Sequence, residues 1–138
     1  MSKSRQPRAL PNQPRVFLPT GGLVEETGPV VRTKIVLLCP EREVAQNISV
    51  QQLAAFIQLV TARAQEILAD STTAFDLLLA ITLHPLSAHK FDIFTSVEVD
   101  RHLLMRFYTS VAAVAPIYTR EKPVAFQIEF RITAGDRS

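Results

Sequence analysis

The histidines are the side chains of this sequence best suited to metal or acid–base chemistry. His84 and His89 bracket one short segment, and His102 follows further along the chain. A zinc site needs three or four ligands that are held in fixed orientation. The nearby carboxylates of Asp92 and Asp100 are expected on unrelated elements. We therefore interpret the histidines as ordinary loop residues and predict no metal site.

Two other routes to chemistry are also weakly supported. Cys39, the only cysteine, ends an apolar run, and a buried thiol without a basic neighbour is a core residue rather than a nucleophile. A single cysteine excludes an intramolecular disulfide, so a reducing, cytoplasmic location fits best. After residue 31 the only glycine is Gly135, whereas a phosphate-binding loop needs several glycines. We lean against an enzyme and predict no cofactor.

The positive charge of the chain is concentrated at its N-terminus. Lys3, Arg5, Arg8 and Arg15 lie in a stretch without acidic residues, and the rest of the chain has eleven basic and thirteen acidic residues. Residues 1–31 also hold five of the nine prolines and three of the four glycines, so we expect an extended or disordered arm. A partner with a phosphate backbone could bind only through this arm.

The first structured elements are expected directly after the arm. Lys34 to Cys39 is a continuous apolar run of strand length, which indicates a strand buried on both faces and central in its sheet. Ser49 followed by Gln52 is typical of a capping box, so a helix should begin there. The helix should end near Asp70. Its apolar residues follow three-four spacing: Leu53, Phe56, Ile57, Val60, Ala64, Ile67 and Leu68.

The remaining elements alternate strand, strand, helix and strand. Residues 75–83 and 91–99 place apolar side chains on one face at period two, and the short connector between them favours a hairpin. Asp100 can cap a second helix, whose apolar stripe ends near Pro116. Residues 124–133 alternate almost perfectly, which predicts a strand with one wet face.

The predicted order is β-α-β-β-α-β within one α+β domain at residues 32–134, followed by a C-terminal tail at 135–138. This is the split βαβ, or ferredoxin-like, order, in which a four-stranded sheet carries two helices on one face. We expect right-handed crossovers to place the first and third strands at the centre. A last strand that extends a three-stranded meander would keep the class and change the strand order.

The face of the sheet away from the helices is the best candidate for a functional surface. Its apolar centre and polar rim resemble a protein-interaction surface, although scattered surface apolar residues would give the same composition. The predicted surface residues are Leu78, Ala80, Phe94, Gln127, Glu129 and Arg131. Our leading hypothesis is a non-enzymatic protein-interaction or assembly module that acts through this open sheet face or an edge strand, as a homo-oligomer or in a larger assembly.

Two alternatives remain open. The first is a nucleic-acid-associated protein in which the basic arm contacts phosphates. The second is a small-molecule binder or minor enzyme with a pocket between the second helix and the sheet, where Tyr108, His102 or His84 would supply polar groups. The sequence contains no apolar run of 18 residues, so we expect no membrane span.

Overall fold

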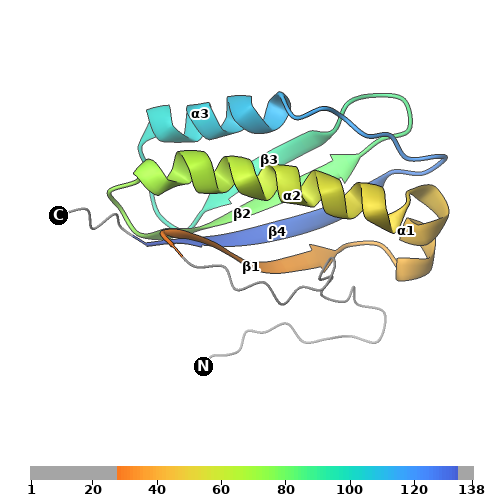
Figure 1. Cartoon of the computed structure of the whole chain (residues 1–138), viewed down its shortest axis with the longest axis horizontal. Helices are drawn as coiled ribbons and strands as arrows, with labels where there is room; N and C mark the ends of the chain where they lie inside the picture. The colour runs from red at the N-terminus through yellow and green to blue at the C-terminus, as the bar shows by residue number, and fades with distance from the viewer. Residues whose placement is uncertain (1–27, 134–138) are drawn as a thin grey trace.

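This computed structural model describes residues 28–133, which form four strands and three α-helices. In chain order they are β1 (Val30–Leu37), α1 (Glu41–Asn47), α2 (Val50–Ile67) with a 3-10 turn η2 (Leu68–Asp70), β2 (Phe75–Leu83), β3 (Lys90–Thr95), α3 (Arg101–Ala112) and β4 (Val124–Ile132). Figure 1 shows α2 and α3 side by side over one face of the sheet. The predicted α+β class is confirmed.

The sheet is antiparallel throughout, with the strand order β1-β4-β2-β3. β4 and β2 are therefore central, and β1 and β3 are the edges (Figure 1). The expectation that the first and third strands lie at the centre is wrong, and the ferredoxin-like order is not confirmed. Each crossover joins two parallel strands with one antiparallel strand between them. Right-handed crossovers are possible in both the ferredoxin-like strand order and the observed one, so handedness does not distinguish the two orders.

Strand length and burial explain the observed order. β2 and β4 have nine residues each and bury every second side chain, whereas β3 has six residues and its inward side chains are only half-buried. β1 contains an irregularity between Arg32 and Lys34, which suits an edge better than a centre. The expectation that this strand is buried on both faces is also wrong. Ile35 is buried against the helices, but Val36 is half-buried and Leu38 is exposed.

The core fills the space between the sheet and the two long helices. The helices bury the apolar stripes predicted from their spacing, and β2 and β4 bury their alternate residues beneath them. Full burial of a large apolar side chain stabilises the fold by roughly 1.5 to 3 kcal/mol. The largest fully buried side chains include Phe56, Phe107, Phe126, Phe130, Ile35, Leu37, Leu53, Leu77 and Leu79.

The predicted starts of both long helices are confirmed. The hydroxyl of Ser49 accepts a hydrogen bond from the N–H of Gln52 at 3.0 Å, and the carboxylate of Asp100 accepts from the N–H of His102 at 3.3 Å. In the described structure the Gln52 side chain does not return the bond, so only half of the capping box forms. α2 and η2 together end at Asp70, as expected.

The short helix α1 was not predicted, and it is fixed by contacts with a distant part of the chain. Asn47, its last residue, is only 5% exposed. The Asn47 amide nitrogen donates to the Glu43 carbonyl at 2.9 Å. The Asn47 side-chain oxygen accepts from the N–H groups of Glu121 and Lys122 at 3.0 and 2.8 Å. Asn47 therefore attaches α1 to the connector that leads into β4.

β3 is shorter than predicted, because its last residues form local hydrogen bonds. The hydroxyl of Thr95 donates to the carbonyl of Val97 at 2.7 Å, which turns the chain away from the ladder. Ser96 makes the last contacts with β2. Its hydroxyl accepts from the N–H of Asp76 at 2.9 Å, and its own N–H donates to the Asp76 carbonyl at 2.9 Å.

Candidate interaction surface on the open sheet face

The sheet has one face under the helices and one face without a helix among the described residues. We call the second one the open face. Because successive strand residues point to opposite sides, the pairing register assigns its side chains. They are Val31, Lys34, Val36, Asp76, Leu78, Ala80, Thr82, Lys90, Asp92, Phe94, Ala125, Gln127, Glu129 and Arg131, with Leu38 directly after β1. All of them are half-buried or exposed.

The open face brings together the six surface residues named from the sequence. Leu78 of β2 pairs with Phe94 of β3 on one side and with Glu129 of β4 on the other. Ala80 stands opposite Gln127 one row along the same strands. Arg131 lies at the end of β4 that is nearest the start of β2. The six residues therefore form one continuous area rather than scattered points.

An apolar path crosses the open face from one edge to the other. The N–H of Leu38 donates to the carbonyl of Ala125 on β4. Ala125 is in turn a diagonal cross-strand neighbour of Ala80 on β2. Ala80 and Leu78 are neighbours on the same face of β2, and Leu78 pairs with Phe94. Leu38 and Phe94, the two ends of the path, are 45% and 55% exposed. We call these five residues the apolar diagonal.

Charged side chains flank the apolar diagonal in equal numbers of each sign. Lys34 Nζ lies 3.8 Å from Glu129 Oε2 across β1 and β4. Arg131 Nε lies 3.2 Å from Asp76 Oδ1 across β4 and β2. The six charged residues of the open face are Lys34, Lys90 and Arg131 against Asp76, Asp92 and Glu129. The open face therefore has no net charge, which disfavours it as a binding surface for a polyanion.

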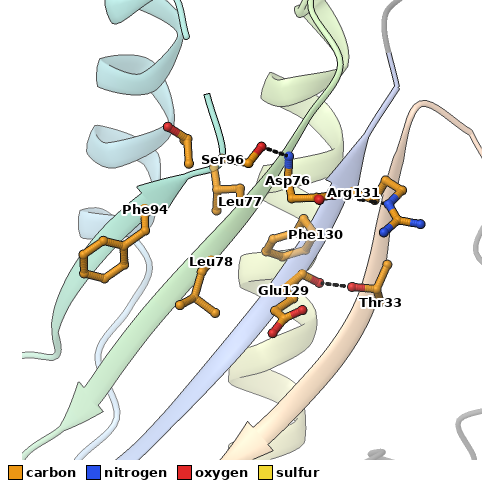
Figure 2. A pocket seen from close by; sticks show the side chains of 10 residues that line it. Thr33, Asp76, Leu77, Leu78, Phe94, Ser96, Glu129, Phe130 and Arg131 are labelled. Carbon is orange, nitrogen blue, oxygen red and sulfur yellow. Dashed lines mark hydrogen bonds and ion pairs between the residues drawn. The ribbon is translucent and has the colours of Figure 1, made fainter. Parts of the chain in front are cut away.

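A shallow hollow of about 260 Å³ lies on the open face beside Phe94. Figure 2 shows Phe94 at one side, Thr33 and Arg131 at the other, and Leu78 and Glu129 between them. Thr33 is held at the rim because its hydroxyl donates to the Glu129 carbonyl at 3.2 Å. The hollow thus has apolar and charged walls, and the aromatic ring at its edge remains exposed.

His89 is the histidine that differs most from the expected loop residue. It is only 7% exposed, and its ring packs edge-on against Phe56 and stacks on Phe91, with centroids 5.0 and 6.0 Å apart. Its Nε2 lies 3.0 Å from the Val111 carbonyl, which can only accept, so Nε2 carries the proton. The described residues contain no group of three or more His, Cys, Asp or Glu side chains that could hold a metal.

The groups suggested for a small-molecule pocket are not brought together. Tyr108 is half exposed on α3 and packs on Phe91, with ring centroids 4.7 Å apart. Tyr108 borders an open depression with His89 at the β3 edge, whereas His102 borders another beside Asp70. His84 lines neither of these depressions. The buried side chains of α3, which face the sheet, are the apolar Leu103, Phe107 and Val111.

Three further sequence predictions concern Cys39, the basic arm and a membrane span. Cys39 is half-buried rather than fully buried, and its sulfur lies 3.5 Å from the backbone nitrogen of Ala125. Lys3, Arg5, Arg8 and Arg15, the basic residues of the arm, lie outside the described residues. None of the helices in residues 28–133 is long and apolar enough to cross a membrane.

Comparison with known proteins adds no relative from which a function could be transferred. No protein-family model matches the chain, and no curated protein or solved structure matches it.

Proposed function

We propose that this protein is a non-enzymatic interaction module that binds a protein partner through its open face. The apolar diagonal carries the proposal. Leu38 and Phe94 are large apolar side chains that remain about half exposed on a face that no described helix covers. A continuous apolar patch with a polar rim is the composition of a protein-binding surface.

The open face is favoured over an edge strand as the binding element. Natural sheets protect their edges with bulges, short strands and charged residues. β1 has an irregularity next to Thr33, and β3 has only six residues, two of which are Lys90 and Asp92. Both edges therefore carry features that oppose the addition of another strand.

A protein partner is favoured over nucleic acid and over a small substrate. The balanced charges of the open face offer no positive track for phosphates. The hollow beside Phe94 is shallow, and the nearest ionisable groups, Asp76, Glu129 and Arg131, are engaged in cross-strand ion pairs. The unpaired thiol of Cys39 is consistent with the proposed cytoplasmic location.

Site-specific photo-crosslinking tests this proposal. A photoreactive phenylalanine analogue replaces Phe94 on the open face, and the same analogue replaces Leu59 on the outer side of α2 as a control. Leu59 is 49% exposed, so the two positions are matched in accessibility. In cells of the organism that encodes the chain, we expect covalent protein adducts from position 94 and few from position 59. Equal labelling at both positions, or none at either, would refute binding through the open face.

A further inference from the structure

We infer that the partner on the open face is a second copy of this chain, and that Phe94 of each copy inserts into the hollow of the other. This inference rests on the proposed function and adds the identity of the occupant. Three properties of the open face support it: the position of the hollow, the balance of charge and the size of the sheet.

The first property is that an exposed aromatic ring and a hollow lie side by side. In a two-fold dimer, residue i of one copy contacts residue j of the other, and the reverse contact follows by symmetry. A two-fold axis that passes between Phe94 and the hollow would place each ring in the opposite hollow. The hollow of about 260 Å³ is open to solvent, so a ring carried on a partner's surface can enter it, whereas a small free molecule would not be enclosed there.

The walls of the hollow suit an aromatic ring. Leu78 offers an apolar floor, and Arg131 lies at the rim opposite Phe94 (Figure 2). A guanidinium group over an aromatic face is attractive, and Arg is the cation that most often takes this role. An inserted ring would therefore contact the apolar Leu78 and would present its face to the Arg131 guanidinium.

The second property is charge balance. Two identical surfaces must carry identical charges, so a net positive or net negative face would repel its own copy. The open face has three residues of each sign, and two of the opposite-charge pairs are already formed within one chain. Copies can therefore meet without net repulsion, whereas a strongly charged partner would gain nothing from this face.

The third property is size, which predicts a reversible dimer. Four strands about 4.8 Å apart, each with roughly eight residues at about 3.4 Å per residue, give a projected area of about 500 Å². A stable interface typically buries about 800 Å² on each partner. The core of one chain is complete without the open face. We therefore expect folded monomers that associate as concentration rises.

Sedimentation equilibrium of the full chain tests the inference. The concentration series should run from about 1 μM to about 1 mM, because a modest interface gives a dissociation constant within this range. We expect a monomer–dimer equilibrium with little dependence on salt. Phe94→Glu should weaken it at least about tenfold, and Leu59→Glu on α2 should not. A monomer at every concentration, or a dimer that ignores Phe94→Glu, would overturn the inference.

Disulfide trapping provides a second readout that does not depend on the charged variant. In a Cys39→Ala background, one chain carries Phe94→Cys and the other carries Thr33→Cys at the far rim of the hollow. We expect the mixed pair to form a disulfide-linked dimer faster than Leu59→Cys chains do. No preference for the mixed pair would count against insertion of residue 94 into the hollow.

The photo-crosslinking experiment separates this inference from the proposed function. Adducts from position 94 that join two copies of the chain support both. Adducts with a different protein keep the open face as a binding surface but overturn the second copy as its occupant. Adducts within one chain to residues 1–27 would overturn both, because the chain would then cover its own open face.

Discussion

Arg131 of β4 donates a hydrogen bond from Nε to Oδ1 of Asp76 on β2 over 3.2 Å, and the two residues are direct cross-strand partners. Their side chains are about two thirds exposed, so water screens the attraction. Exposed ion pairs contribute less than about 1 kcal/mol. In a double-mutant cycle with Asp76→Asn and Arg131→Gln, we expect a coupling energy below that value that decreases with added salt.

Urea unfolding at low protein concentration measures this coupling. A coupling energy of several kcal/mol would instead mean that the Asp76–Arg131 pair is shielded from water in the isolated chain. That result would contradict the exposure of the open face and the proposals that depend on it.

Phe126 and Phe94 lie on opposite faces of the sheet and allow a matched comparison. Phe126 is fully buried beneath the helices, whereas Phe94 is 55% exposed. Truncation of a buried phenylalanine costs about 3 to 5 kcal/mol. We expect Phe126→Ala to lower the free energy of unfolding by this amount and Phe94→Ala to lower it by less than about 1 kcal/mol.

Denaturant unfolding of dilute protein measures both variants. A large loss from Phe94→Ala would show that the ring stabilises the monomer, which would remove the reason to assign it to a partner. The combination of a small effect on stability and a large effect on dimerisation is the signature we expect for Phe94.

Asn47 joins α1 to the connector before β4, and its replacement should be costly. Asn47→Ala leaves the N–H groups of Glu121 and Lys122 without their acceptor in a partly buried setting. Each unsatisfied buried group costs about 1 to 3 kcal/mol, although water can reach part of such a site. We expect a loss of about 2 to 3 kcal/mol in the free energy of unfolding.

Gln46→Ala is the control for Asn47. Gln46 is exposed, and only its backbone carbonyl, which accepts from Arg120 at 2.8 Å, takes part in this contact. Chemical denaturation should therefore show a change within about 0.5 kcal/mol for Gln46→Ala. A loss from Asn47→Ala no larger than that from Gln46→Ala would show that the Asn47 hydrogen bonds contribute little to stability, since alanine has the higher helix propensity in both cases.

The sequence predicts best those elements that are specified by local patterns. Ser49 and the apolar spacing behind it define α2, and period-two alternation defines β2 and β4. The order of strands is a non-local property, and handedness alone did not decide it. Strand length did not decide it either, because residues 91–99 were predicted to form as long a strand as residues 75–83, and the bond from Thr95 to Val97 that ends β3 early is not visible in the alternation. The uniform apolar run of β1 was misleading, since Val36 and Leu38 belong to the open face.

The candidate surface follows the same division. Alternation was enough to place Leu78, Ala80 and Phe94 on one face with residues of β4. Lys34 and Asp76 were not included, because their ion pairs depend on cross-strand register and on the irregularity in β1. α1 was missed for a related reason, since its stability comes from a connector more than seventy residues away in sequence.

His89 offers a test of whether a buried polar ring is needed for folding. Its Nε2 donates to the Val111 carbonyl, but that carbonyl also accepts from the N–H of Val114 at 3.1 Å. Its Nδ1 is buried without a hydrogen-bond partner in the structure. His89→Phe therefore removes an unsatisfied polar atom, leaves the carbonyl satisfied and keeps a ring between Phe56 and Phe91.

We expect His89→Phe to change the free energy of unfolding by less than about 1 kcal/mol or to raise it. His89→Ala should lower it by about 2 kcal/mol or more, because it opens a cavity between two aromatic rings. Thermal and urea unfolding measure the two variants side by side. If both lose stability equally, the hydrogen bond to Val111 matters more than packing. If only the alanine variant does, His89 serves the core by its shape.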